Sequence, residues 1–139
     1  MTVEDYGQTE TTHLEANKAV VARAVERVIN NGDLDAADEL YAPAVAAGAK
    51  AWVAPFRASF PDVHMATVAL IAEGDTVVGH FRCSGTHQGR WLGVDPTGRS
   101  FKDVDEVYWF TLEAGRITAW WGLEDNDARL RQLGLRGPR

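Results

Sequence analysis

The chain has 139 residues, of which 45% are apolar and 24% charged, and its formal net charge is -6. These values are typical of one globular domain with a real core, and they exclude a disordered chain. The 14 basic residues are scattered, so nucleic acid is not an expected partner. The single cysteine, Cys83, excludes an internal disulfide. Because the N-terminus is polar and no apolar run approaches about 20 residues, the sequence predicts a soluble cytoplasmic protein without a membrane partner.

The first half of the chain is predicted to be helical. Residues 1–12 are polar and expected to be flexible. Apolar residues recur at helical spacing from His13 to Asn30, which predicts a first helix. A short second helix is expected from Leu34 to Leu40. A third is expected from about Ala49 to Ser59, where Pro55 predicts a kink or a later start.

After Pro61 the apolar pattern changes to the period of two that is typical of strands. Four strands are predicted, over Val63 to Ala72, Thr76 to Thr86, Ser100 to Leu112 and Gly115 to Leu123. A closing helix is expected from Asn126 to Leu133, before a tail at 136–139. Helices followed by hairpin-connected strands predict a single α+β domain over residues 13–135. Its curved, mostly antiparallel sheet would form a cone around the helices and leave an internal pocket.

The last predicted strand ends in a carboxylate. Strict alternation places Ile117, Ala119, Trp121 and Leu123 on one face, and Asp125 ends the same row. A carboxyl at the end of an apolar row has a raised pKa, which suits it to proton transfer. The alternative is that Asp125 only caps the closing helix.

Six short motifs occur in order along the chain. They are Phe60-Pro61-Asp62, Glu73-Gly74-Asp75, Gly85-Thr86-His87-Gln88-Gly89, Pro96-Thr97-Gly98-Arg99, Gly115-Arg116-Ile117 and Trp121 to Asp125. Over about residues 17–135 the sequence resembles the SnoaL-like polyketide (ester) cyclases of the nuclear transport factor 2-like superfamily. The resemblance implies a cyclase that acts on a polyketide-derived small molecule. It also implies that Asp125 removes a proton next to a carbonyl, so that an intramolecular aldol closes a ring without metal or cofactor.

The chain departs from the family pattern in three places. Ala119-Trp120-Trp121 stands where members often carry Glu-His-Trp, and Tyr108 stands where many have an Asp. Only Ala42 to Gly48 joins the second and third helices, where the family usually has a strand and a loop. These departures leave other functions open on the same scaffold: epoxide-opening ring closure, a cofactor-independent hydroxylase, an epoxide hydrolase or isomerase, or a non-catalytic ligand-binding module.

Two further residues are candidate catalytic groups. His87 can bond a substrate oxygen or pair with Asp125, or it can simply fix its loop by bonding to backbone. Asp105 can line the cavity beside Asp125 or lie at a solvated strand end. The scaffold also resembles limonene-type epoxide hydrolases, which use an Asp-Arg-Asp set. Arg82, Asp105 and Asp125 supply these residue types.

The candidate substrate-binding residues are mostly aromatic. They are Trp52, Phe56, His80, Trp91, Tyr108 and Trp121. His80 reaches the pocket only if its face of the strand is concave, and is otherwise exposed. Trp91 and Leu92 lie in a long loop flanked by glycines, which predicts a lid at the pocket mouth.

No zinc spacing and no phosphate-binding glycine loop occurs in the sequence, so no cofactor is expected. A homodimer or higher homo-oligomer is expected. The convex face of a sheet with helices on one side would be bare, and we place Val78 and Phe110 on that face.

Overall fold

A computed structural model describes residues 2–136. Helix α1 (Val3–Arg23) continues directly into the π-helical segment η1 (Ala24–Asn30), so the first helix begins at Val3 rather than at His13. The predicted second helix is a 3-10 turn, η2 (Leu34–Ala36), followed by α2 (Ala37–Leu40). No helix within residues 2–136 is long and apolar enough to span a membrane.

Helix α3 (Pro43–Ser59) begins earlier than predicted. The expected start near Ala49 is wrong because Pro43 occupies the first turn, where a missing backbone N–H costs nothing. The helix also continues through Pro55. Tyr41, which lies between α2 and α3, forms an isolated parallel bridge with Ile117.

The second half of the chain is an antiparallel meander. Its strands are β1 (His64–Glu73), β2 (Thr76–Thr86), β3 (Ser100–Glu113) and β4 (Arg116–Glu124), in the spatial order β1-β2-β3-β4, and the last element is α4 (Asn126–Gln132). The predicted strands and the closing helix agree with these bounds to within one residue at each end.

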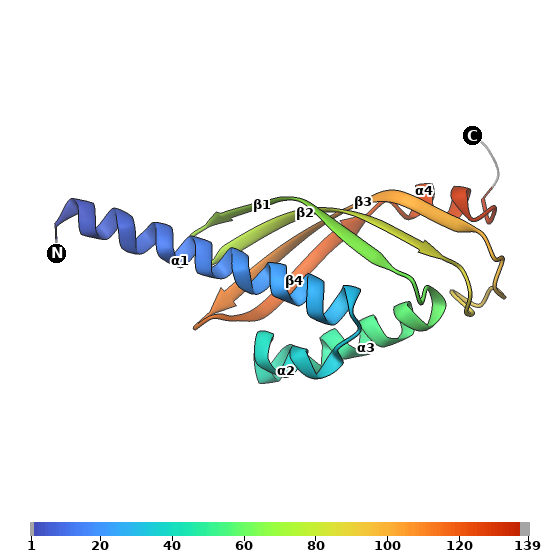
Figure 1. Ribbon diagram of the computed structural model, residues 1–139, viewed down its shortest axis with the longest axis horizontal. Coiled ribbons are helices and arrows are strands. Elements are labelled where there is room, and N and C mark those ends of the chain that lie inside the picture. Colours follow the sequence, from blue (N-terminus) through green and yellow to red (C-terminus); the bar gives the residue numbers. More distant parts are fainter. Residues whose placement is uncertain (1, 137–139) are drawn as a thin grey trace.

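The curved sheet covers the first three helices (Figure 1). The core lies between the concave face of the sheet and these helices, and it includes Val28, Val53, Phe60, Phe81 and Ile117. The α+β cone predicted from the sequence is therefore confirmed.

A β-bulge at Thr118 decides which residues of β4 face the core. The extra residue reverses the alternation beyond it. The inward row is therefore Ile117, Trp120, Gly122 and Glu124. The predicted row is wrong beyond Ile117, since Trp121 and Leu123 are 56% and 71% exposed on the convex face. The predicted outward position of Phe110 is also wrong, because Phe110 is buried in the core.

Candidate active site

A narrow apolar pocket lies between the concave face and the helices. Its cavity volume is about 10 Å³, and it is lined by Ile29, Tyr41, Trp52, Met65, Tyr108, Phe110 and Trp120. We call it the inner pocket. The rings of Tyr41 and Trp120 meet edge to face at a centroid distance of 5.4 Å. This volume is room for about one water molecule, so a ring system enters only when the lining side chains move apart.

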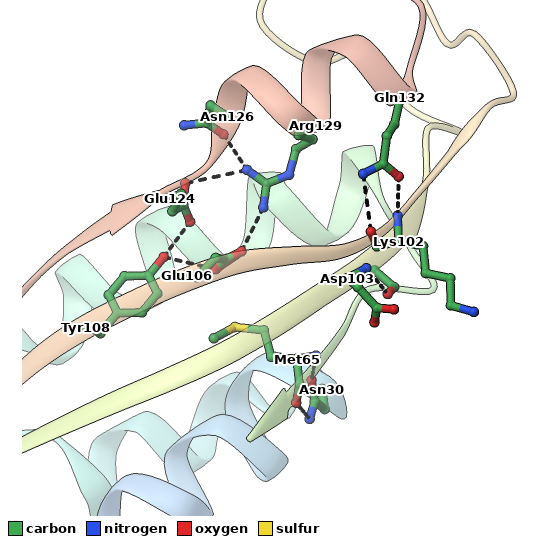
Figure 2. A network of polar contacts seen from close by, with 11 residues as sticks. Asn30, Met65, Lys102, Asp103, Glu106, Tyr108, Glu124, Asn126, Arg129 and Gln132 are labelled. Carbon is green, nitrogen blue, oxygen red and sulfur yellow. Dashed lines mark hydrogen bonds and ion pairs between the residues drawn. The ribbon is translucent and has the colours of Figure 1, made fainter. Parts of the chain in front are cut away.

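The hydroxyl of Tyr108 connects the wall of the inner pocket to a charged cluster (Figure 2). The hydroxyl donates to Glu124 Oε1 and lies 3.3 Å from Glu106 Oε1. Arg129 Nη2 donates to Glu106 Oε2 at 2.7 Å, and Nη1 lies 3.7 Å from Glu124 Oε2. Nη1 also donates to the side chain of Asn126.

Packing against neighbouring residues fixes the positions of Tyr108 and Arg129 in this cluster. Gly122 lies opposite Tyr108 across the β3–β4 ladder, and a Cβ at Gly122 would come within 2.3 Å of the Tyr108 ring. The phenol therefore lies flat against β4. Helix α4 buries Arg129 completely, with its guanidinium 4.7 Å from the ring centre of Phe101 and 5.5 Å from that of Phe56.

The cluster places two carboxylates beside one guanidinium. Burial and the charge of Glu124 raise the pKa of Glu106, Arg129 opposes the shift, and the resulting pKa is about 7. Glu106 therefore carries a proton for much of the time at neutral pH. Burial and the neighbouring carboxylates also raise the pKa of Tyr108, so its hydroxyl stays protonated as a donor. The thiol of Cys83, whose pKa burial raises, likewise stays neutral.

A second hollow lies outside the inner pocket, between α3 and the loop after β2. This outer groove has a volume of about 450 Å³ and is lined by Trp52, Pro55, Phe56, Ala58, Ser59, Arg90, Trp91 and Leu92. Its loop is bound to the end of α3, because the N–H groups of Gln88 and Gly89 both donate to Ser59 O at 3.0 Å. A side chain at Gly89 would clash with the backbone of α3. Trp91 thus lies in a groove wall, while Leu92 projects into solvent.

Comparison with known proteins identifies the family and the fold. The family model for SnoaL-like polyketide cyclases matches residues 19–133. The chain belongs to the SnoaL-like polyketide cyclase family. No curated protein matches it significantly in sequence.

Several solved structures share the fold of this SnoaL-like protein. TsrD from Streptomyces laurentii has a TM-score of 0.78 at 26% identity, covering 88% of this chain and 97% of its own. IdmH from Streptomyces antibioticus, a proposed polyketide cyclase, has a TM-score of 0.71 at 27% identity, covering 85% and 98%. AclR from Streptomyces galilaeus, a proposed hydroxylase, has a TM-score of 0.81 at 22% identity, covering 91% and 85%, and shows the fold alone.

Asp125, the acid that the family resemblance favours, lies outside the inner pocket. Its side chain is exposed and accepts the N–H of Ala128 at 3.0 Å, so it caps α4. The expected position at the inner end of an apolar row is wrong, because the bulge at Thr118 turns Glu124 inward instead. A catalytic role for Asp125 stays a prediction.

His87 is fully buried behind the outer groove, against the rings of Phe60 and Trp91. The backbone N–H of Thr97 donates to its Nδ1 at 3.2 Å, so the neutral ring carries its proton on Nε2. No described residue accepts that proton. The contact with Thr97 agrees with the alternative in which His87 fixes its loop by bonding to backbone. The structure does not bring His87 and Asp125 together.

Three of the expected site residues lie on the convex face, because the pleat of the sheet points them away from the helices. His80 Nε2 lies 2.8 Å from Asp105, and Arg82 Nε lies 3.5 Å from the same carboxylate. The hydrogen bond with His80 lowers the pKa of Asp105. Trp121 stacks on Trp109 at 5.1 Å. The expected places of His80, Asp105 and Trp121 in the pocket are thus corrected, whereas Trp52, Phe56, Trp91 and Tyr108 line the two hollows.

The sequence interpretation missed Glu106, Glu124 and Arg129. Glu106 could have been recognised from the sequence, because it interrupts the inward-facing row of Val104, Tyr108 and Phe110 on β3. Glu124 was hidden by the bulge, and a buried arginine in a short helix has no distinctive pattern. Among the residues that the structure describes, no three His, Cys, Asp or Glu side chains are grouped as a metal site requires.

Proposed function

We propose that this protein is a small-molecule cyclase that acts on a polyketide-derived ketone by cofactor-independent acid/base catalysis. The observation that carries the proposal is Tyr108, which lines the inner pocket and whose hydroxyl contacts two carboxylates. An aromatic wall suits a flat ring system. The carboxylates provide groups that accept and return a proton.

Glu124 is the more accessible carboxylate of the pair, since its side chain is 28% exposed while that of Glu106 is 2% exposed. In the proposed reaction Glu124 takes the proton from a carbon next to a carbonyl, and the C–H electron pair forms an enolate. The Tyr108 hydroxyl then donates to the enolate oxygen. The enolate carbon attacks a second carbonyl of the same molecule, and the new alkoxide recovers the proton from Glu124.

Glu106 and Arg129 would tune this step without touching the substrate. Protonated Glu106 can donate to the Tyr108 oxygen across the 3.3 Å contact, which strengthens the hydroxyl as a donor. Arg129 holds Glu106 in place through the 2.7 Å hydrogen bond. The cluster therefore keeps one proton close to the pocket at neutral pH.

Epoxide opening is a second candidate reaction, because the cluster places an arginine between two carboxylates. Glu106, Arg129 and Glu124 form an acid–arginine–acid set inside the cone, in place of the one expected from Arg82, Asp105 and Asp125. One carboxylate could take a proton from water while the other gives a proton to the epoxide oxygen. Water then opens the ring to a diol, or an internal nucleophile closes a new ring.

Mass spectrometry of products from an aromatic keto ester and its epoxide distinguishes these reactions. Unchanged mass or loss of water indicates cyclisation, a gain of water indicates hydrolysis, and a gain of one oxygen indicates hydroxylation. Tyr108→Phe and Glu124→Gln should each lower turnover by roughly a hundredfold. Tyr41→Phe makes the same change elsewhere in the pocket wall and should retain turnover. Binding without any product would instead support a ligand-binding module.

We propose that two copies pair through the convex face. Large apolar side chains are exposed there, namely Ile71, Trp109, Trp121 and Leu123. Trp109 and Trp121 stack with nearly parallel rings, which gives the face a flat aromatic centre. A second copy would remove this apolar surface from water.

A further inference from the structure

We propose that the outer groove binds a flat aromatic acid, and that Leu92 covers the bound ligand. This binding site is separate from the proposed reaction, because the residues that line the groove include neither Tyr108 nor the carboxylates of the cluster. The groove has a volume of about 450 Å³. Sites for small organic ligands usually measure about 300–1,000 Å³, so a ring system fits the groove as it stands.

Leu92 has a backbone conformation that is unfavourable for a leucine. Leu92 and Gly93 are the central residues of a tight turn, in which Trp91 and Val94 exchange backbone hydrogen bonds of 3.0 and 2.8 Å. Both central residues have positive φ, 49° and 76°, as in the type I′ turns that Asn and Gly prefer. A leucine at positive φ is strained, because its Cβ crowds the neighbouring carbonyl oxygen.

The side chain of Leu92 adds a second cost, since it is 73% exposed to water at the edge of the groove. The fold gains little from an apolar side chain that it does not bury, so neither cost is offset within this chain. Strained residues tend to persist where they serve a function. A ring system in the groove would bury the leucine against its face and so offset the exposure.

The walls of the groove are aromatic and held in place. The ring of Trp91 packs edge to face on that of Phe60 at a centroid distance of 5.3 Å, and Phe56 lines the same hollow from α3. The Ser59 hydroxyl donates to the carbonyl oxygen of Arg90 at 2.7 Å, which ties the loop to α3. These contacts position Trp91 before a ligand arrives, so binding costs less ordering of the loop.

The charge of the groove favours an anion. Arg90 is the one charged side chain among the described residues that line it, and that side chain is 67% exposed. Its Nη1 donates to Asp95 at 3.1 Å, and its other N–H groups can donate to a carboxylate of the ligand. Two fused aromatic rings that carry a carboxylate match the walls, the volume and the charge of this groove.

2-Naphthoate and its neutral analogue 2-acetonaphthone test the proposal. The five indole N–H signals are assigned by single Trp→Phe variants and followed by NMR during titration. 2-Naphthoate should shift the signal of Trp91. The signal of Trp120 in the inner pocket should stay unchanged, and so should those of Trp109 and Trp121 on the convex face. 2-Acetonaphthone should bind roughly fivefold more weakly, because it cannot pair with Arg90.

Leu92→Asn should make the protein more stable and the groove a weaker binding site. Asparagine tolerates positive φ, so the melting temperature should rise by roughly 2–4 °C. Loss of the apolar cover should weaken 2-naphthoate binding roughly tenfold. Ala114→Asn is the matched control, because Ala114 also has a φ of 49° but lies in the turn between β3 and β4. It should gain stability and keep 2-naphthoate affinity within about twofold.

Arg90→Gln should remove the preference for 2-naphthoate over 2-acetonaphthone, and a preference that persists would overturn the assignment of an acid. The proposal is also overturned if 2-naphthoate shifts no indole signal, if it shifts Trp120 in place of Trp91, or if Leu92→Asn keeps the affinity or the stability of the wild type. A change of oligomeric state in Leu92→Asn, without ligand binding to the wild type, would assign the groove to a second copy instead. These readouts measure binding and not turnover, so this proposal and the proposed function can fail independently.

Discussion

Arg129 donates to Glu106 at 2.7 Å, and neither side chain is more than 2% exposed. A buried ion pair contributes little relative to an apolar pair, but removal of one partner strands the other charge. The rings of Phe56 and Phe101 pack on the guanidinium, so its loss also leaves space unfilled. This pair therefore fixes α4 to the concave face.

Arg129→Met should lower the free energy of unfolding by about 1–3 kcal/mol, because it removes the hydrogen-bond donor of buried Glu106, which then stays protonated. Urea unfolding at neutral pH measures the change. Arg131→Met is the matched control on the same helix. It removes an exposed i,i+4 pair with Asp127 and should cost about 0.5 kcal/mol or less. Equal losses in both variants would contradict a special role for the buried pair.

Stability should fall as pH rises through the range in which Glu106 ionises. Its pKa is about 7 in the folded protein, against a usual value of 4.5. Between these values the folded chain binds more protons than the unfolded chain, so the free energy of unfolding decreases as pH rises and then levels off. Thermal unfolding from about pH 5 to about pH 8 should show this decrease, with a smaller one in Glu106→Gln. Identical decreases in both proteins would assign the effect to other groups.

The two roles open to Asp125 give different results for two substitutions. Asn can still accept the N–H of Ala128, so Asp125→Asn should leave stability nearly unchanged. Asp125→Ala should cost about 1 kcal/mol through loss of the cap. If Glu124 is the base, both variants should retain turnover. If Asp125→Asn instead loses about a hundredfold in turnover without a change in melting temperature, Asp125 is the catalytic acid that the family resemblance favours.

Sedimentation should show a dimer of the 15.2 kDa chain at micromolar concentration. Trp121→Arg places a charge on the aromatic centre of the convex face and should yield monomers. Leu92→Arg changes an exposed apolar residue on the groove loop and should leave the dimer intact. A wild-type monomer, or a dimer that tolerates Trp121→Arg, would exclude this interface.

Local pattern was enough to predict the elements of the second half of the chain. The turns at Glu73-Gly74-Asp75 and at Gly115 occur where glycines adopt positive φ, and they fix the hairpins. Pro43 lies beyond the predicted end of the second helix at Leu40, and because proline also begins helices, the start of α3 was missed. The interpretation of residues 1–12 as polar and loose likewise missed their part in α1.

The candidate site depends on relationships that a single sequence does not display. The extra residue at Thr118 reverses which face of β4 each later residue occupies. Glu124, rather than Asp125, therefore points toward the helices. The partner of Glu106 comes from α4, and no spacing along the chain links β3 to that helix. The aromatic residues near the pocket were predictable because their type alone suggests a flat ligand, whereas the charged ones required tertiary contacts.

Hydrogen–deuterium exchange of α-tetralone in D₂O tests the central claim most directly, since it needs only removal and return of the proton next to the carbonyl. NMR follows loss of that proton signal with wild-type protein, Glu124→Gln, Asp125→Asn and buffer alone. The wild type and Asp125→Asn should accelerate exchange over buffer, and Glu124→Gln should lose roughly a hundredfold of that acceleration. No acceleration by the wild type, or acceleration that survives in Glu124→Gln but not in Asp125→Asn, would contradict acid/base catalysis by the Glu106–Tyr108–Glu124 cluster.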